Sequence, residues 1–453
     1  MSYNIIRHNG VTRFWYNVLS TIKELVAIIS NGTTSNVLQA NTQGTSGNAN
    51  FGFTVELDLG KYICFNGQLS NADNQFLIGK GVTQSDLTLT SSAGTGSIFF
   101  GDADFDPYAR GQAGGACKLD TDTALVCVPQ VGTGNVFKVI TYSGGTANIV
   151  TSLTFNDGDT TNYIDRFPKF QVLKVTGSVY TVASTGLSRT GAFPYARVWD
   201  IDLSGSGSAT SRGIIYPMGT SGSGNGATQL CYLGTVGGKE CFAIFYAKST
   251  SGAGVAYYAV YEYNTSTNTL VEVVGDTLYK SGSNSFEANV QFKIEDGVGI
   301  VLFVENSNTG QIAGVKWNGT TLSIGSLSSF GSSSSPARFP AIRQYYNGEE
   351  NSTSQFVMGA GVDQNTSGVK AVYNVFPASY NSTSNVFNTT DFNGSDSNNV
   401  LSDSSTTTTF SGVLHNTFIG LEDYEYGATI NVYRDSVGTF RGSKMNSFKM
   451  SYN

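Results

Sequence analysis

Two segments, CKLDTDTALVC at residues 117–127 and CYLGTVGGKEC at 231–241, carry two cysteines each at one identical spacing. Metal-binding cysteines usually form short C-x₂-C knuckles, whereas these intervals are long and filled with strand-forming residues. Folding each segment back as an antiparallel hairpin sets Cys117 opposite Cys127 and Cys231 opposite Cys241, with a three-residue loop between the strands. The spacing therefore indicates a repeated β-hairpin rather than a zinc site.

The same hairpin recurs along the chain. A three-residue hairpin loop favours a left-handed residue at its third position, and Gly and Asn adopt that conformation most readily. Further hairpins with such a residue are VELDLGKYICF (55–65), FQVLKVTGSVYTV (170–182), VQFKIEDGVGIVLFV (290–304), SGVLHNTFIGL (411–421, loop 414–416) and a less regular one around Gly348. Seven hairpins about sixty residues apart form an internal repeat of the kind that marks propellers.

Each hairpin is followed by a third alternating apolar segment, and most by a fourth. The 54 glycines and the low charged fraction of 13% also favour short strands joined by turns over long helices. We therefore expect an all-β fold, a seven-bladed β-propeller of four-stranded antiparallel blades over residues 51–453. The rival all-β fold is a parallel β-helix, whose coils are shorter and lack a hairpin in each repeat.

The cysteines are then packing residues at matching positions of two blades. The first blade has Thr54 and Cys64 at these places, so the position does not require a bridge. Buried cysteine often acts as a small apolar side chain, and five cysteines, an odd number, suit a reducing compartment. We expect free thiols, with cross-strand disulfides as the alternative.

Residues 13–30, RFWYNVLSTIKELVAIIS, are expected to form an α-helix, because apolar residues recur at alternating steps of three and four. This seam consists of Trp15, Val18, Ile22, Leu25 and Ile29. A polar Gly/Ser/Thr/Asn-rich connector follows, so residues 1–50 are expected to be a helical anchor and linker. The helix is too short to stand alone in water, so it packs on the propeller or docks on a partner.

Charge and hydropathy exclude several partners. The net charge of −7 and the absence of a run of Lys or Arg disfavour nucleic acid. No stretch of about twenty apolar residues exists, and the N-terminus lacks the pattern of a signal peptide. We therefore expect that the protein does not insert into a membrane. We also expect that it is made in a cytoplasm.

Residues for catalysis are scarce. The chain has two histidines, His8 and His415, too few to assemble a Ser-His-Asp or Cys-His arrangement. Carboxylates gather in two segments that read as turns, with Asp102, Asp104 and Asp106 in one and Asp157, Asp159 and Asp165 in the other. The first group resembles the start of a calcium loop, but Pro107 stands where glycine is needed. We expect no catalytic residue, no metal and no cofactor, and hence no enzyme.

A basic and an aromatic residue precede several first strands of the repeat. They are Tyr108 and Arg110 in PYARG, Arg166 and Phe167 in DRFPKF, and Arg338 and Phe339 in ARFPAI. In a propeller these segments run near the axis, so the side chains would ring the central channel; the alternative is that they lock blade to blade. Sialidases bind a carboxylate with such an arginine ring, but their Asp-box turns, S-x-D-x-G-x-T-W, are absent from this sequence.

The whole chain resembles the fibre, spike or decoration proteins of tailed bacteriophages, in its N-terminal anchor, polar connector and Gly/Ser/Thr/Asn-rich β domain. The resemblance implies a structural virion protein, made in the host cytoplasm and free to form homo-oligomers. Its N-terminal helix would bind other virion proteins, and its propeller would bind a host-surface glycan or a neighbouring protein. The alternatives are a lectin-like carbohydrate-binding propeller and a glycan-cleaving propeller enzyme.

Overall fold

The structure is a computed structural model. Its backbone describes residues 3–8, 11–16, 25–29, 35–38, 48–58, 61–71, 74–85, 88–91, 97–100, 115–130, 133–143, 146–161, 164–188, 193–219, 228–250, 253–282, 284–286, 293–305, 309–330, 338–344, 355–362, 372–388, 400–402, 410–420, 426–435 and 440–452. Side chains are described for 55–58, 63, 65, 115–128, 133–143, 147–161, 168–188, 193–219, 228–248, 254–282, 284, 286, 293–305, 309–330, 342 and 378–388.

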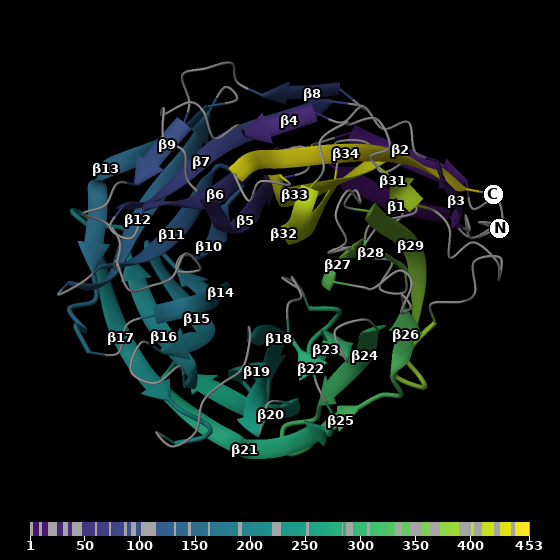
Figure 1. Cartoon of the computed structure of the whole chain (residues 1–453). Coiled ribbons are helices and arrows are strands. Elements are labelled where there is room, and N and C mark those ends of the chain that lie inside the picture. Colours follow the sequence, from purple (N-terminus) through teal and green to yellow (C-terminus); the bar gives the residue numbers. More distant parts are fainter. Residues whose placement is uncertain are drawn as a thin grey trace.

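The fold is a β-propeller, with antiparallel sheets standing around a central opening (Figure 1). Three of the sheets have four strands each, in sequence order from the axis outward. They are β10 (Gly115–Asp120), β11 (Thr123–Gln130), β12 (Gly134–Ser143) and β13 (Thr146–Asn156); β14 (Ile164–Thr176), β15 (Val179–Ser188), β16 (Pro194–Asp202) and β17 (Ser208–Ile215); and β18 (Gln229–Val236), β19 (Lys239–Thr250), β20 (Ala253–Asn264) and β21 (Thr269–Lys280).

Three further sheets have five strands, because two short strands pair with the third strand of each. They are β5 (Asn48–Asp58), β6 (Lys61–Asn71), β7 (Asn74–Ser85), β8 (Thr88–Ser91) and β9 (Ser97–Phe100); β22 (Asn284–Ser285), β23 (Val298–Glu305), β24 (Thr309–Trp317), β25 (Leu322–Ile324) and β26 (Ser328–Phe330); and β27 (Arg338–Gln344), β28 (Gln355–Val362), β29 (Val372–Asn381), β30 (Val386–Asn388) and β31 (Val400–Ser402).

The last sheet combines both ends of the chain. It contains β32 (Phe410–Gly420), β33 (Tyr426–Asp435) and β34 (Phe440–Tyr452), and both β3 (Leu25–Ile29) and β4 (Ser35–Leu38) pair with β34. A separate hairpin joins β1 (Tyr3–His8) to β2 (Val11–Tyr16). The outer edge of the last sheet is thus supplied by residues about 400 positions earlier in the sequence.

The expected helix over residues 13–30 is not found. In the part of the chain that the structure describes there is no helix, and Trp15 lies in β2 while Leu25 and Ile29 lie in β3. Val18 and Ile22 lie outside the described residues. The reason for the error is physical: the run LVAII is rich in β-branched residues, and the exposed edge of β34 offers it backbone partners that a short amphipathic pattern cannot reveal.

Five of the predicted hairpins are present with two-residue rather than three-residue loops, and the predicted loop around Gly348 lies outside the described residues. Asp120 pairs with Thr123, Thr176 with Val179, and Val236 with Lys239. The loop Gly237-Gly238 has positive φ at both residues, 61° and 78°, as a two-residue type I′ turn requires. At the other end of the chain, β32 continues through His415 and Asn416, so the predicted loop 414–416 is wrong.

A leucine lies at a register shift before the turn in four of these hairpins and within β32. The shift falls between the residues on either side of Leu57, Leu119, Leu173, Leu233 and Leu414. Leu57 and Leu233 are fully buried, and Leu119 and Leu173 nearly so. A β-bulge changes the direction of a side chain and bends the strand. A leucine at a bulge on the first strand is therefore a feature that recurs in several blades.

The bulge also changes the cysteine register. Cys117 pairs with Leu125 and Cys127 with Gly115, whereas Cys231 pairs with Ala243 and Cys241 with Gly234. The members of each pair lie on adjacent strands, as expected, but not opposite each other. All four are buried free thiols, and desolvation raises the pKa of Cys117 and Cys231 to about 12.

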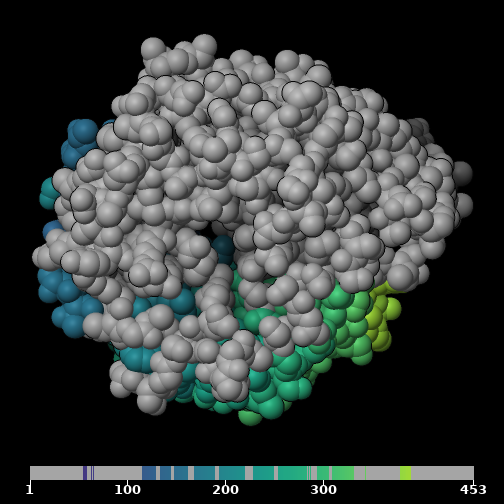
Figure 2. Space-filling model, viewed as in Figure 1, coloured from purple at the N-terminus to yellow at the C-terminus, as the bar shows by residue number. Residues whose placement is uncertain are grey.

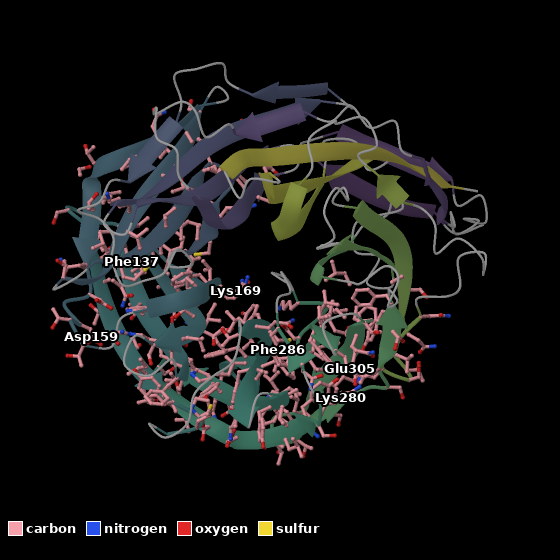
Figure 3. All side chains as sticks on the ribbon, viewed as in Figure 1. Phe137, Asp159, Lys169, Lys280, Phe286 and Glu305 are labelled. Carbon is pink, nitrogen blue, oxygen red and sulfur yellow. The ribbon has the colours of Figure 1, made fainter. Side chains whose placement is uncertain are left out.

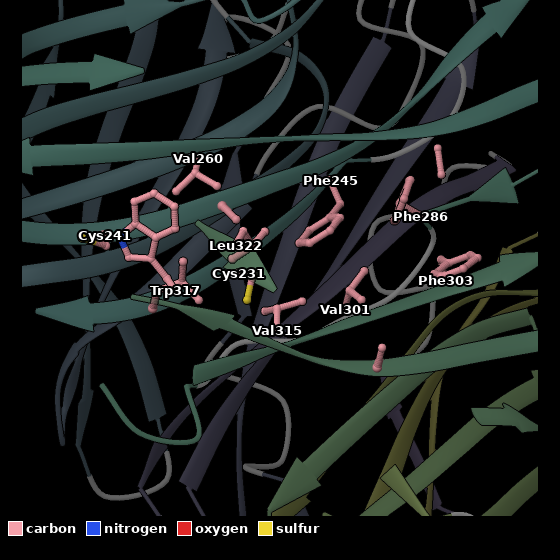
Figure 4. Close-up of a cluster of buried hydrophobic side chains, with 14 of the residues drawn as sticks. Cys231, Cys241, Phe245, Val260, Phe286, Val301, Phe303, Val315, Trp317 and Leu322 are labelled. Carbon is pink, nitrogen blue, oxygen red and sulfur yellow. The ribbon is translucent and has the colours of Figure 1, made fainter. Parts of the chain in front are cut away.

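Apolar side chains fill the spaces between neighbouring sheets. Between the β18–β21 sheet and the β22–β26 sheet, Phe245, Phe286 and Phe303 pack with ring centroids 5.6–6.1 Å apart (Figure 4). Between the β14–β17 sheet and the β18–β21 sheet, Phe242 and Tyr261 stack at 5.4 Å. Burying one such aromatic ring contributes roughly 1.5–3 kcal/mol, so these layers supply much of the cohesion of the ring.

Buried amide side chains tie adjacent sheets together. Gln229 in β18 donates to the carbonyl of Ile300 and accepts from the N–H of Leu302, both in β23. Asn385, before β30, donates to the carbonyl of Gly314 in β24. These bonds satisfy polar groups that burial would otherwise leave unpaired. They also fix the position of each sheet relative to its neighbour.

Candidate functional site

The first strands of six sheets, together with β23, the second strand of the β22–β26 sheet, surround the central opening. In sequence order, β5 contacts β10, β10 contacts β14, β14 contacts β18, β18 contacts β23, β23 contacts β27, β27 contacts β32, and β32 contacts β5. The surface is hollowed near the middle of the disc (Figure 2). A concave opening lined by several strands is where propeller folds offer a ligand site, so polar groups on these strands are candidate ligand contacts.

Lys169 on β14 is a described cation at this opening (Figure 3). Its neighbours Pro168 and Phe170 are buried, and Phe170 packs with Trp199 at a centroid distance of 6.0 Å. The amine of Lys169 extends from β14 into the central space (Figure 3). Burial lowers the pKa of Lys169 to about 8, because desolvation disfavours the charged form.

The other lysines of the described part differ from Lys169. Lys239, Lys248, Lys280 and Lys293 form ion pairs with carboxylates. Lys169 has no hydrogen-bond or ion-pair partner among the described side chains, and neither has Lys118, which is exposed to solvent. Lys169 therefore combines partial burial with donors that no described side chain takes up, which is a condition that favours binding of a ligand oxygen.

Arg166 and Arg338 occupy equivalent backbone positions. Arg166 pairs with Leu187, and the next pair is Lys169 with Thr185. Arg338 pairs with Gly361, and the next pair is Ala341 with Gly359. In both strands a Phe-Pro pair lies in the register shift, where the missing N–H of proline costs no ladder bond.

The predicted channel ring is placed only in part. Arg166 and Phe167 lie on β14, and Arg338 and Phe339 lie on β27, both first strands beside the opening. Their side chains are outside the described set, and Tyr108 and Arg110 lie outside the described residues. The ring itself therefore stays a prediction.

Asp157 and Asp159, two of the predicted carboxylates, belong to a buried ion cluster. The Arg197 guanidinium lies 3.0 Å from the Asp157 carboxylate and 3.2 Å from that of Asp159. Trp199 Nε1 and Asn135 Nδ2 also donate to Asp157, at 3.2 and 2.8 Å. The Asp157 side chain is 0% exposed, so this cluster joins the β10–β13 and β14–β17 sheets and offers no free carboxylate.

Nothing in the sequence marks Arg197 and Trp199 as partners of this cluster. They lie in ARVWDID, which reads only as an alternating third strand, and they are about forty residues from Asp157. Asp165 lies in β14 with its side chain undescribed, and Asp102, Asp104 and Asp106 lie outside the described residues. Among the side chains that are described, no group of three or more His, Cys, Asp or Glu could hold a metal ion.

A second polar cluster lies at the outer side of the β18–β21 sheet. Tyr246 Oη donates to Asp276 at 2.6 Å, Tyr261 Oη donates to Glu272 at 3.1 Å, and Lys248 pairs with Asp276. Burial, with the nearby charge of Asp276, raises the pKa of Glu272, while the Tyr261 bond lowers it. Each carboxylate here has a partner, so the cluster completes the sheet margin rather than presenting a site.

The part of the chain that the structure describes contains no helix that could cross a bilayer. No protein-family model matches the sequence, and no curated protein matches it.

Similar solved structures have low sequence identity. A protein of unknown function from Dyadobacter fermentans is 9% identical, with a TM-score of 0.46, over 94% of this chain and 99% of that one. The sialidase NanB of Streptococcus pneumoniae is 12% identical, with a TM-score of 0.43, over 96% and 72%. An α-L-arabinofuranosidase of Fusarium graminearum is 12% identical, with a TM-score of 0.43, over 76% and 95%.

The expectation that the chain is not an enzyme is corrected by these comparisons. Two of the three structures described above are glycan-acting enzymes, and a leech trans-sialidase and a gluconolactonase are also similar. The likeness bears on fold and gives this chain no particular reaction.

Proposed function

We propose that this protein is a seven-bladed β-propeller that binds a glycan at the mouth of its central opening. The blade count is supported by seven sheets of four or five strands in the described part of the chain. It is also supported by the cycle of contacts among the strands that line the opening, which are six first strands and β23, and which returns from β32 to β5.

The observation that carries the proposed site is Lys169. An ammonium group provides three donors, and the hydroxyl and carboxylate oxygens of sugars accept them. Lys169 is partly buried, its amine lies in the central space, and no described side chain takes up its donors. Bound glycan oxygens would compensate the desolvation that now lowers its pKa.

A glycan suits this opening better than a nucleic acid does. The chain carries a net charge of −7, so the phosphate backbone of a nucleic acid would be repelled at long range. An uncharged or weakly charged saccharide avoids this repulsion and can enter a narrow concave site. The same opening could bind a glycan without cleaving it or could bind and cleave it. A test of function must therefore measure both glycan binding and glycan cleavage.

The test is a glycan array followed by calorimetry and product analysis on the full chain. We expect Lys169→Met to weaken the best glycan by roughly tenfold or more, consistent with loss of a charge-assisted hydrogen bond. Lys118→Met removes the same charge from an exposed lysine and should leave affinity unchanged. Binding that survives Lys169→Met, or the absence of any bound glycan, would refute the proposed site.

The virion role stays a separate prediction. The docking arm proposed for it included Leu25 and Ile29, which lie in β3 beside β34. Deleting residues 1–50 would therefore remove two strands of the last sheet, and the loss of assembly alone would not reveal a docking arm. Substituting Trp15 in the β1–β2 hairpin by Asp, then measuring incorporation into particles, separates docking from folding.

A further inference from the structure

The turn between β24 and β25 contains an Asn-Gly pair that is exposed to solvent. Asn318 directly follows β24, and its side-chain oxygen accepts hydrogen bonds from the N–H groups of Thr320 and Thr321, at 2.9 and 2.8 Å. Gly319 has a φ of 93°, a conformation that residues with a Cβ rarely adopt. Asn318, Gly319 and Thr320 are all exposed, so water reaches this turn.

An asparagine that precedes glycine can react with the backbone beside it. The glycine nitrogen attacks the side-chain carbonyl carbon of the asparagine, and the new C–N bond closes a five-membered succinimide ring. The bond from that carbon to the side-chain nitrogen breaks, and this nitrogen leaves as ammonia with the proton that the glycine N–H gives up. Water then opens the ring at either carbonyl. The products are aspartate and isoaspartate, whose backbone runs through the side-chain carbon.

The turn at Asn318 favours the first step of this reaction. Attack places negative charge on the side-chain oxygen, and the two N–H groups that already donate to this oxygen would stabilise that charge as an oxyanion hole does. Gly319 has no Cβ to obstruct the approach, and its own N–H makes no hydrogen bond within the described part of the chain. We propose that Asn318 is a site of spontaneous deamidation in the folded protein.

Two other turns have the same hydrogen bonds but lack the glycine. Asn264, between β20 and β21, accepts from the second and third N–H groups after it at 2.9 and 3.3 Å. Asn381, between β29 and β30, does so at 2.9 and 3.1 Å. A threonine follows the first and a serine the second, and their side chains hinder the attack.

Asn66 and Gly67 have the sequence but lack the turn. Both lie within β6, where they pair with β5 on one side and with β7 on the other. The extended backbone of a central strand is held in place by both neighbours, so the glycine nitrogen is not free to close a ring. The chain therefore contains separate controls for the sequence and for the turn.

The competing effect of the two bonds is protective, since they could hold the side chain of Asn318 away from the Gly319 nitrogen. In that case Asn318 would be as durable as Asn264 and Asn381. The relative rates of these asparagines in one sample therefore separate promotion from protection.

The two products should differ in their effect on the sheet. β25 has three residues, and its pairing with β24 begins at Leu322, close to the turn. Isoaspartate lengthens the turn backbone by one carbon, so we expect it to loosen β25. Aspartate keeps an oxygen acceptor in the place of the asparagine oxygen, so we expect it to leave the sheet intact.

The experiment keeps the full, folded chain at neutral pH for several weeks and follows each asparagine by peptide mass spectrometry. Methyl transfer by an isoaspartyl methyltransferase measures the isoaspartate. We expect Asn318 to deamidate roughly tenfold or more faster than Asn66, Asn264 and Asn381. Gly319→Ala should slow the reaction by a similar factor, and Thr265→Gly should make Asn264 reactive.

Each result supports or refutes the proposal. If Asn318 lasts as long as Asn264 and Asn381, its hydrogen bonds are protective and the proposal fails. If Asn66 reacts as fast as Asn318, the turn is not the cause and the proposal also fails. Should Gly319→Ala not fold, an Asn264 that stays unreactive in the Thr265→Gly variant would refute it.

The melting temperature tests the effect on β25. Asn318→Asp supplies the aspartate product alone, and it should melt like the unaltered protein. The aged sample should melt earlier in proportion to its isoaspartate content. An aged sample that is rich in isoaspartate and melts like Asn318→Asp would show that the turn backbone does not hold β25 in place.

Discussion

Gly299 on β23 faces the sulfur of Cys231 on β18 so closely that a methyl group at position 299 would overlap it. The contact crosses from one sheet to the next, because β18 and β23 are first and second strands of neighbouring sheets. Cys231 is 1% exposed and belongs to the aromatic layer between them. The thiol therefore fills a space that only glycine leaves open, and this explains why a free cysteine lies there without a bridge.

Gly299→Ala is expected to destabilise the fold by about 1–3 kcal/mol, because the added methyl must displace the sulfur or shift a strand. Chemical denaturation measures this as a lower midpoint at constant slope. In a Cys231→Ala background the same glycine change should cost much less, since the sulfur is gone. Equal costs in both backgrounds would show that this contact is not what excludes alanine.

Asp157→Ala should be among the most destabilising single changes, by roughly 3–5 kcal/mol, because it leaves the Arg197 guanidinium buried without its main partner. The control is Arg212→Ala, which breaks the more exposed pair with Asp200 and should cost less than about 1 kcal/mol. Urea unfolding of both variants gives the comparison. Similar costs would mean that the buried cluster adds little cohesion between these two sheets.

Glu272 predicts a pH dependence of stability. Its folded-state pKa is raised, mainly by burial, so the folded chain holds this proton more tightly than the unfolded chain does. Ionisation of Glu272 therefore costs stability as pH rises from the unfolded pKa through the folded one. Glu272→Gln should raise the melting temperature at pH 7 relative to the unaltered protein, and should do so less at pH 4.

Asp296 is the control of opposite sign. The bond from Lys293 lowers its pKa, so the stability it contributes is present at neutral pH and is lost as pH falls through the lowered pKa. Asp296→Asn should thus lower the melting temperature slightly at pH 7 and little at low pH. If both variants shift in the same direction, the assigned causes are wrong.

Lys169 should react with acylating reagents faster than other lysines. With a pKa of about 8, half of its amine is neutral at pH 8, whereas a lysine of ordinary pKa is under about 1% neutral there. Limited acetylation followed by peptide mass spectrometry should label Lys169 ahead of the ion-paired Lys239 and Lys280. A labelling rate for Lys169 that still climbs steeply between pH 9 and pH 10 would contradict the lowered pKa.

Local patterns carried the fold prediction, because a hairpin is specified by residues close in sequence. The four-stranded repeat followed from turns such as Gly177 and Gly237 and from the alternating strands beside them. The register within the hairpins did not follow, since the bulges at Leu119 and Leu233 shift it. The turn between Asp120 and Thr123 lies closer to Leu119 than the turn between Val236 and Lys239 lies to Leu233. The identical cysteine spacings therefore arise from two different turn positions.

Long-range partners explain what the sequence could not show. The pairing of β3 with β34 joins residues about 400 apart, and a heptad-like seam in Leu25 to Ile29 gives no sign of it. Arg197 finds Asp157 only once two sheets have packed. The Arg-Phe-Pro repeat was visible in the sequence, but its equivalence needed the strand register.

The pairing of β3 and β4 with β34 has a consequence for how the chain folds during synthesis. These two strands leave the ribosome early, and their partner ends only at Tyr452. At about 5–20 residues per second, translation of the intervening 400 or so residues takes roughly 20–80 s. During that interval the apolar run LVAII has no native strand partner, so it is an aggregation hazard, and we expect the ring to close last during folding.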